Sequence, residues 1–421
     1  MLDIKFIRQN PEKVKEGCQK KGVKVDIDKL LEVDKKRRET LQALEDMRAQ
    51  KNKASKEIRQ AKSKGEKDVI ILKMRELDGN SDRLTQTLKE SDEEFNRLML
   101  QLPNLPLDDV PVGKDERDNE VLKEVGKKPK FSFKPKDYLE IAENLDIIDV
   151  KRAAKVSGTR FGYLKREATL LEFALIRLAL ETLTKKGFVP VVPPVMIKPE
   201  MARGMGYPEQ FNGEEAYHLE KDNLFLVATA EQSIGTMHSG EIFQEKDLPK
   251  RYIGFSTCFR REAGSYGKDT KGIFRVHQFD KMEMFSFCKP EDSQKEHQFF
   301  LEIEKGLMND LKIPYQVVRI CTGDLGFPAA SKYDIEAWLP SEGRYRETHS
   351  TSICTDFQAR RLDTRYRDLK TKKLEFVQTV NGTVFAIGRM LIAIIENYQQ
   401  KDGSIEVPKV LQKYTGFKKI G

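Results

Sequence analysis

The sequence lacks the features of a membrane or secreted protein. Among its 421 residues no apolar run reaches the ~18–20 residues that a membrane span requires. The first residues, MLDIKFIRQNPEKVKEG, contain no apolar segment of the kind found in secretory signals. With 38% hydrophobic and 34% charged residues, the composition predicts a soluble, folded protein of two or three domains.

Cysteine and histidine are scarce and scattered. The five cysteines are Cys18, Cys258, Cys288, Cys321 and Cys354. No two have C-x-x-C spacing, and the five histidines form neither H-E-x-x-H nor H-x-H. These absences argue against a disulfide framework, a zinc knuckle and a metal held mainly by histidine and cysteine, so we expect a reducing, cytoplasmic location. Rossmann and P-loop glycine motifs are also absent.

Basic charge is concentrated in one stretch. The net charge is +8, and residues 48–75 hold ten basic and three acidic residues, a local excess of +7. A focused basic segment indicates a polyanionic partner, although a solvated helix face gives the same pattern. The side chains that we expect to contact this partner are Arg48, Lys51, Lys53, Lys56, Arg59, Lys62, Lys64 and Lys67.

Residues 1–103 are predicted to form a helical arm. Positions spaced alternately by four and three residues recur on both sides of a turn signal at 62–66, which is typical of an antiparallel coiled-coil hairpin. The seam positions are Val33, Arg37, Thr40, Leu44, Met47, Lys51, Ala54, Ile58 and Ala61, then Ile70, Met74, Leu77, Ser81, Leu84, Leu88, Ser91, Phe95 and Leu98. Because the basic stretch straddles the turn, its charge lies at the distal end, which favours a nucleic-acid partner.

The rest of the chain differs in character. Residues 104–136 are rich in proline and glycine, and we expect a connector without regular structure. In residues 137–421, short β-like runs separated by turns alternate with helical segments, including an apolar helix over 169–186 that ends before Gly187. This pattern predicts an α+β domain built on an antiparallel sheet flanked by helices.

Two stretches carry residues suited to a nucleotide. In FRREAGSYGKDTKGIFRVHQFDKMEMF (259–285), Arg260 and Glu262 are predicted on one face of a first strand. Arg275, Phe279 and Glu283 are predicted on one face of a second strand. A guanidinium suits a phosphate and an aromatic plane suits a base, although a salt-bridge ladder beside a core phenylalanine fits the same spacing.

The second stretch is NGTVFAIGRMLIAII, residues 381–395. It runs from a strand-like segment through Gly388 into an apolar helix, and Arg389 falls at the start of that helix. Anions are favoured at such a position, although a surface arginine at a helix start fits the same pattern.

These segments resemble the class II aminoacyl-tRNA synthetases. FRRE…RVHQFDKME is similar to motif 2, NGTVFAIGRMLIAII to motif 3, and Gly187-Phe188…Pro194 to motif 1, the helix–strand–proline element of the dimer interface. The hairpin, VPVGKDERDN, ATAEQ, AGSYGKDTKG, TDFQARR and ENYQQKDGSIEVPKVLQKY extend the likeness over essentially the whole chain, to seryl-tRNA synthetases of the ordinary bacterial type.

The resemblance implies an activity. A homodimer is expected to join L-serine to the 3′ end of serine tRNA through seryl-adenylate, with ATP and Mg²⁺, and also to serylate selenocysteine tRNA. The likeness to the ordinary type implies, in addition, that no zinc is bound. The basic arm would hold the tRNA by its backbone.

The resemblance also assigns residue roles. Arg260, Glu347 and Arg389 are expected to be catalytic. The expected ATP-binding residues are Arg260, Arg261, Glu262, Phe279, Glu347, Thr348, His349, Ser350 and Arg389. The expected serine-binding residues are Thr229, Ala230, Glu231, Glu283 and Thr383, and the division of roles between the two glutamates stays open. Glu347 and Ser350 are expected to bind Mg²⁺.

One segment departs from the family pattern. This chain has E-T-H-S at 347–350, where bacterial relatives usually have E-[IV]-S-S. The departure leaves His349 without an assigned role, and a structural histidine is the favoured interpretation.

Two alternatives stay open. The first is a synthetase paralogue that loads an amino acid onto a carrier protein, but such proteins lack the basic hairpin. The second is a non-catalytic nucleic-acid binder with a decayed enzyme domain, and decay is expected to erase Arg260, Glu283 or Arg389, which are all present.

Overall fold

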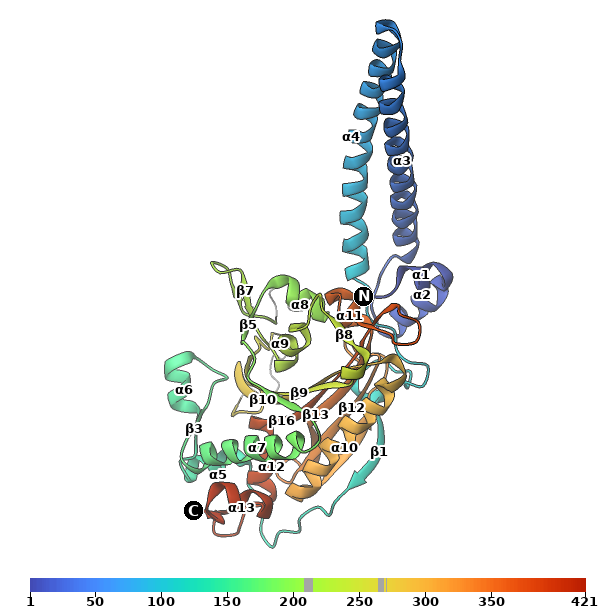
Figure 1. Ribbon diagram of the computed structural model, residues 1–421. Coiled ribbons are helices and arrows are strands. Elements are labelled where there is room, and N and C mark those ends of the chain that lie inside the picture. The colour runs from blue at the N-terminus through green and yellow to red at the C-terminus, as the bar shows by residue number, and fades with distance from the viewer. Residues whose placement is uncertain (208–214, 264–268, 270) are drawn as a thin grey trace. The chain divides into compact units, whose positions relative to one another are not determined.

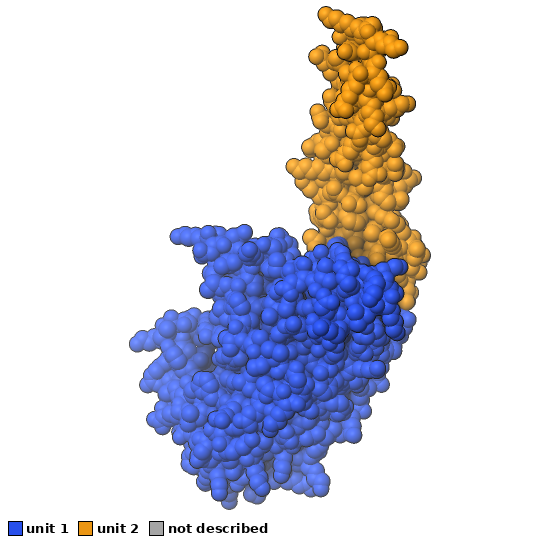
Figure 2. Space-filling model, viewed as in Figure 1, with its two compact units in different colours: residues 1, 20–22, 104–421 blue, residues 2–19, 23–103 orange. Residues whose placement is uncertain are grey.

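A computed structural model describes residues 1–207, 215–263, 269 and 271–421 (Figure 1). The chain divides into two compact units (Figure 2). One comprises residues 2–19 and 23–103, and the other comprises residues 1, 20–22 and 104–421. Within the described ranges, no helix combines the length and the apolar character that crossing a membrane demands.

The smaller unit is helical. Its helices are α1 (Ile4–Gln9), α2 (Pro11–Lys20), α3 (Ile27–Gln60) and α4 (Lys64–Leu100). The two long helices α3 and α4 pair as an antiparallel hairpin (Figure 1). Every predicted seam position is buried or half-buried, whereas most positions between them are exposed. The predicted hairpin is therefore confirmed.

The turn of the hairpin lies earlier than predicted. Ser63 is the N-cap of α4, and its hydroxyl accepts a hydrogen bond from the Glu66 amide at 3.2 Å. The Glu66 carboxylate in turn accepts from the amides of Lys62 and Ser63. This capping box starts the helix at Lys64, so Gly65 is helical and the turn comprises residues 61–63 rather than 62–66.

The larger unit is built on an eight-stranded sheet. The strand order is β1 (Glu120–Val125), β11 (Tyr315–Arg319), β12 (Ser331–Leu339), β13 (Arg344–Thr355), β16 (Gln378–Ala386), β10 (Gln278–Cys288), β9 (Lys250–Phe259) and β4 (Val189–Val191). Neighbouring strands are antiparallel except β4 and β9, which are parallel. The unit is thus the predicted α+β domain.

The connector contains a strand that the sequence did not predict. Residues 120–125 form β1, which pairs with β11 at one edge of the sheet. Nearly all of its side chains are exposed, so the strand carries no apolar alternation by which a sequence pattern could reveal it. Asn104 also holds the start of the connector against the end of β13, because its side-chain amide donates to the Cys354 carbonyl at 2.8 Å.

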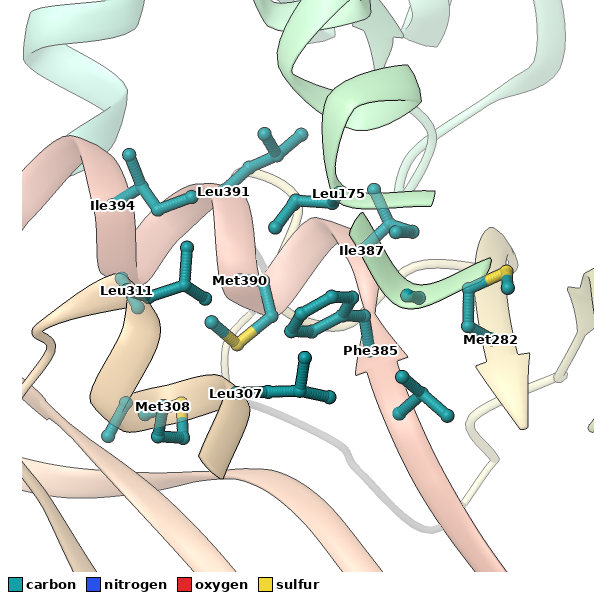
Figure 3. Close-up of a cluster of buried hydrophobic side chains, with 14 of the residues drawn as sticks. Leu175, Met282, Leu307, Met308, Leu311, Phe385, Ile387, Met390, Leu391 and Ile394 are labelled. Atoms are coloured by element: carbon teal, nitrogen blue, oxygen red, sulfur yellow. The ribbon is translucent and has the colours of Figure 1, made fainter. Parts of the chain in front are cut away.

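Helices cover the sheet and close the core. They are α5 (Tyr138–Asn144), α6 (Val150–Ser157), α7 (Glu167–Thr184), α8 (Pro199–Met205), α9 (Ala230–Thr236), α10 (Ser293–Leu311), α11 (Phe357–Leu362), α12 (Ile387–Asn397) and α13 (Lys409–Thr415). Figure 3 shows Leu175 of α7, Leu307 of α10 and Met390 of α12 converging on Phe385 of β16. The predicted apolar helix is α7, which ends before Gly187 at a φ of 84°.

Short strands complete the larger unit. They are β2 (Ile148–Asp149), β3 (Tyr163–Leu164), β5 (Met196–Ile197), β6 (His218–Leu219), β7 (Leu224–Leu226), β8 (Ile242–Gln244), β14 (Arg365–Arg367), β15 (Leu374–Phe376), β17 (Ile405–Glu406) and β18 (Lys419–Ile420). In the described part of the chain the 3₁₀ turns are Glu116–Asp118, Glu245–Asp247 and Pro290–Asp292.

Candidate active site

A cavity of about 610 Å³ lies on the sheet, and we call it the central cavity. Asn381 and Thr383 of β16 line it. A side chain at Gly382, between them, would instead meet Phe300 and Glu304 of α10. The cavity and α10 therefore occupy opposite faces of the sheet, because side chains alternate along a strand.

Most of the expected site residues line this one cavity. They are Thr229, Glu231, Arg260, Glu262, Phe279, Glu283, Glu347, Thr348, Ser350, Thr383 and Arg389. They come from β9, β10, β13, β16, α9 and α12 or from segments next to them. The fold thus brings together positions up to 160 residues apart in the sequence.

The ends of the two central strands differ from the prediction. Strand β9 ends at Phe259, so Arg260 and Glu262 follow it, and Glu262 has a φ of 53°. Strand β10 begins at Gln278, so Arg275 precedes it. Arg275 forms ion pairs with Glu262 at 3.2 Å and with Asp269 at 3.3 Å, and one backbone hydrogen bond, from the Arg260 amide to the His277 carbonyl at 3.0 Å, joins the two segments beyond the strand ends. Residues 264–268 and 270 of the AGSYGKDTKG segment lie outside the described residues.

Two guanidinium groups stand over aromatic rings in the cavity. The Arg260 guanidinium lies 5.2 Å from the centre of the Phe279 ring, and its Nε donates to the Ala228 carbonyl at 3.2 Å. The Arg389 guanidinium lies 4.9 Å from the centre of the Phe274 ring. Such groups can hold the phosphates and the base of a nucleotide.

Glu347 is ionised beside Arg389. The Arg389 Nη1 lies 3.1 Å from the Glu347 Oε2. Burial opposes ionisation, but Arg389 and Lys332 outweigh it and lower the pKa of Glu347 to about 2. The Ser350 hydroxyl lines the same cavity, and a carboxylate with a hydroxyl is a donor set that suits Mg²⁺. Elsewhere among the described residues no three His, Cys, Asp or Glu side chains gather as a metal-binding group.

Glu231 is held by three donors. It accepts hydrogen bonds from the Tyr207 hydroxyl at 2.7 Å, the Gln358 Nε2 at 3.1 Å and the Asn381 Nδ2 at 3.1 Å. Burial raises the pKa of Glu231 above its usual value. Thr229 is the N-cap of α9, the helix whose second residue is Glu231. Glu231 is therefore fixed in place at the cavity wall.

Glu283 is held differently. It lies on β10 opposite Thr383 of β16, and it is 2% exposed. The Lys281 Nζ lies 2.7 Å from its Oε2 and 3.4 Å from the Thr229 hydroxyl, to which it donates. Burial raises the pKa of Glu283 to about 7, with the neighbouring Lys281 opposing the rise. This carboxyl group can therefore gain or lose a proton near neutral pH.

Sequence reasoning missed four of these residues. Lys281 lies two positions from both Phe279 and Glu283, so strand alternation alone could have placed it on their face. Tyr207, Gln358 and Asn381 reach Glu231 only through the tertiary fold, and no local pattern indicates them.

Three expected site residues do not line the cavity. Ala230 is buried in the first turn of α9. The Arg261 guanidinium lies 5.4 Å from the centre of the Tyr217 ring. His349 is buried, with its Nδ1 2.9 Å from the Thr348 hydroxyl, and burial lowers its pKa to about 3. A neutral, packed imidazole agrees with the structural interpretation of His349.

The basic residues of the arm are exposed. Lys51 lies half-buried in the seam and pairs with Asp78 at 2.6 Å. The other seven are exposed, namely Arg48, Lys53, Lys56, Arg59, Lys62, Lys64 and Lys67. Throughout the arm, which the structure describes completely, none of these seven takes part in an ion pair. They are therefore available to a polyanion.

Comparisons with known proteins agree with the geometry. Residues 1–106 match the family model "Seryl-tRNA synthetase N-terminal domain", and residues 216–398 match "tRNA synthetase class II core domain (G, H, P, S and T)". A serine–tRNA ligase of Dictyoglomus thermophilum is 46% identical over 100% of this chain and 99% of its own.

Two solved structures share the fold over the full length. A seryl-tRNA synthetase from Pyrococcus horikoshii in complex with ATP has a TM-score of 0.94 and 43% identity, covering 100% of this chain and 99% of that one. A cytoplasmic serine–tRNA ligase from Naegleria fowleri in complex with AMP has a TM-score of 0.88 and 33% identity, covering 100% and 98%. The chain therefore belongs to the seryl-tRNA synthetase family.

Proposed function

We propose that the protein activates L-serine with ATP and transfers it to the 3′ end of serine tRNA. The observation that carries the proposal is the content of the central cavity. Two guanidinium groups and two aromatic rings lie beside a buried pocket that contains Glu231, Glu283 and Thr383. The first group suits a nucleotide, and the second suits a small amino acid with an ammonium and a hydroxyl group.

In the first step an oxygen of the serine carboxylate forms a bond to the α-phosphorus of ATP. The bond from that phosphorus to the bridging oxygen breaks, and pyrophosphate leaves with the electron pair. Arg260 would neutralise the charge that develops on the phosphoryl oxygens, and Phe279 would stack on the adenine. Glu347 and Ser350 would hold the Mg²⁺ that neutralises the triphosphate charge.

Selection of serine requires a buried partner for its hydroxyl group. Alanine differs only by lacking that hydroxyl, and a site rejects such an analogue strongly when its own polar groups would be left unpaired. Thr383 is 3% exposed and directly opposite Glu283, so it can supply this partner. Glu231 and Glu283 would bind the ammonium group of serine.

The second step uses the arm. Its seven exposed basic side chains would bind the phosphates of serine tRNA, an interaction that weakens with salt. Serylation of selenocysteine tRNA is part of the proposal and is supported by the family resemblance. The presence of the arm favours a tRNA over a carrier protein as the acceptor.

A homodimer is also part of the proposal. Four large apolar side chains of the motif 1 region are exposed, namely Leu170 at 48%, Phe173 at 60%, Val189 at 50% and Val192 at 82%. Strand β4 is an edge of the sheet, so the backbone groups on its outer side can pair with another strand. A second copy of the chain would cover both features. The five buried, free cysteines suit the reducing cytoplasm that we infer as its location.

Exchange of labelled pyrophosphate into ATP, measured with each of the twenty amino acids, tests the first step. Serine alone should support rapid exchange. Charging of serine tRNA and of an acyl-carrier protein, measured on the same preparation, then identifies the acceptor. Exchange with no amino acid would overturn the proposal, and serine transfer to the carrier protein alone would favour the paralogue.

A further inference from the structure

We propose that Lys281 binds the carboxylate of the substrate serine and orients it for attack on ATP. This inference rests on the proposed function, because it assumes that the pocket around Glu283 and Thr383 takes serine. It assigns a binding residue that the sequence motifs did not indicate.

The position of Lys281 is defined by the strand that carries it. Phe279, Lys281 and Glu283 alternate along β10, and all three side chains line the central cavity. Lys281 thus lies between the ring expected to stack on adenine and the carboxyl group expected to bind the serine ammonium. The serine carboxylate must lie in this same region, between the adenine and the serine ammonium, to reach the α-phosphorus.

The contacts of Lys281 leave at least one of its donors for a ligand. An ammonium group has three N–H donors. The Lys281 Nζ donates one to the Thr229 hydroxyl at 3.4 Å, and it forms an ion pair with Glu283 Oε2 at 2.7 Å. The side chain is 12% exposed and lines the cavity, so the remaining N–H group can donate to a ligand in the cavity.

The other cationic side chains that the structure describes in the cavity have partners of their own. Arg389 bonds to Glu347, and Lys332 lies 3.2 Å from Asp334. Arg275 bonds to Glu262 and Asp269. Arg260 donates one N–H to the Ala228 carbonyl and is expected to give the others to the α-phosphate.

A zwitterionic ligand requires both signs of charge within a few ångströms. Glu283 and Lys281 supply an anion and a cation side by side, and Glu283 keeps its second oxygen for the serine ammonium. With both ends of the amino acid held, the carboxylate loses little orientational freedom when the bond to phosphorus forms. Lys281 transfers no proton in this step.

The test compares two ligands that differ only in the carboxylate. At pH 6 serine and serinamide share the ammonium and hydroxyl groups, because an α-amino group beside an amide has a pKa of about 7.7, but serinamide has no negative charge. Isothermal titration of each ligand should show that the wild-type protein prefers serine. Lys281→Met should weaken serine binding by about 10- to 100-fold more than serinamide binding, because loss of the ion pair with Glu283 affects both ligands, whereas the charged hydrogen bond to the carboxylate serves serine alone. Lys281→Arg should restore part of the preference.

A matched variant controls for the removal of a lysine from the cavity. Lys332→Met removes the same type of side chain from the same cavity, and it should leave the ratio of serine to serinamide affinity unchanged. Thermal unfolding of each variant checks that it is folded, and Lys281→Gln replaces Lys281→Met if the latter does not fold.

The outcomes separate the two proposals. An equal loss of serine and serinamide binding in Lys281→Met would show that Lys281 acts through Glu283, and it would overturn this inference alone. A wild-type protein that binds serine without preferring it to serinamide would do the same. A wild-type protein that binds no serine and supports no serine-dependent exchange would overturn the proposed function as well.

Discussion

At the scale of single residues, three carboxyl groups of the central cavity differ in their ionisation because their partners differ. Glu347 is ionised beside Arg389, with a pKa of about 2. Glu231 accepts three hydrogen bonds from neutral donors, and burial still raises its pKa. Glu283 has one cationic partner and a pKa of about 7. Glu347 is therefore suited to a metal cation that arrives with phosphates, whereas Glu231, fixed by neutral donors, and Glu283, paired with Lys281, are suited to an ammonium group.

Serine binding should release a proton from Glu283. In the empty pocket this carboxyl group is about half protonated at pH 7, because its pKa is about 7. An ammonium group beside it favours the ionised form and lowers that pKa, so serine binding should release part of a proton near pH 7, and less as the pH rises to 8. Affinity should therefore increase as the pH rises from 6 to 8. Calorimetry in buffers of different ionisation enthalpy measures the release directly. Equal binding heats in all buffers at pH 7 would contradict the prediction.

Replacing Arg260 should stop adenylate formation without unfolding the protein. The guanidinium is the cation expected at the developing charge on phosphorus, and removal of such a group costs ~3–4 kcal/mol, or about 10²–10³ in rate. Serine-dependent pyrophosphate exchange by Arg260→Ala measures the effect. Arg117→Ala is the control, since Arg117 is an exposed residue paired with Asp115. An Arg260→Ala rate within about threefold of wild type would remove Arg260 from the mechanism.

Thr383→Val should reduce discrimination between serine and alanine. The change removes a hydroxyl group at nearly constant volume, so kcat/KM for serine should fall relative to alanine by ~1–3 kcal/mol if Thr383 pairs with the substrate hydroxyl. Thr364→Val is a matched control, because Thr364 is equally buried but donates to the His238 carbonyl outside the central cavity. The control should lower stability while keeping the serine/alanine ratio. An unchanged ratio in Thr383→Val would show that its role is structural.

At the scale of helices and strands, the sequence alone predicts those elements whose side chains repeat with a regular period along the chain. The seam of α3 and α4 repeats along each helix, so each predicted position could be found without knowing its partner. Strand β1 could not be found in this way, since its exposed side chains show no alternation and its backbone pairs with a strand almost 200 residues away. The ends of β9 and β10 were missed because side-chain spacing does not show where the regular backbone pairing of two strands stops. The expected site residues followed from family motifs, and their burial and pKa values required the fold.

Two glycines should respond to alanine with opposite signs. A Cβ at Gly323 would lie 2.2 Å from the Lys114 carbonyl oxygen, and backbone cannot move aside cheaply. Gly323→Ala should therefore loosen the connector and lower the free energy of unfolding by ~1–3 kcal/mol. Gly306 lies within α10, and a Cβ there would meet no atom within 4 Å. Gly306→Ala should raise stability by ~0.5–1 kcal/mol, because alanine is the better helix former. Urea unfolding of both variants checks the signs, and a stabilised Gly323→Ala would contradict the packing of the connector.

At the scale of the whole molecule, the two compact units divide the proposed reaction between them. Every residue expected to contact ATP or serine belongs to the unit of residues 1, 20–22 and 104–421. The seven exposed basic residues belong to the unit of residues 2–19 and 23–103. Adenylate formation should therefore not require the basic side chains of the smaller unit, and only the transfer of serine to tRNA should depend on them.

Deleting residues 35–98 and bridging the gap with a short glycine linker should separate the two steps. The paired helices α3 and α4 bury their seam against each other, so their removal should not expose the buried apolar side chains of the catalytic unit to water. Pyrophosphate exchange should stay close to wild type, whereas charging of serine tRNA should be abolished because the cations that bind its phosphates are gone. In the full chain, tRNA affinity should fall steeply with salt, with a slope set by the number of phosphates neutralised. Replacing Lys53, Lys56, Arg59 and Lys64 by glutamine should reduce that slope by about 3, since each phosphate that is no longer neutralised lowers it by about 0.7–0.9. Exchange and charging are measured on the same preparations across a salt series. If the shortened protein charges serine tRNA with near wild-type efficiency, then the arm is not the element that binds it, and the concentration of basic charge at its end has another cause.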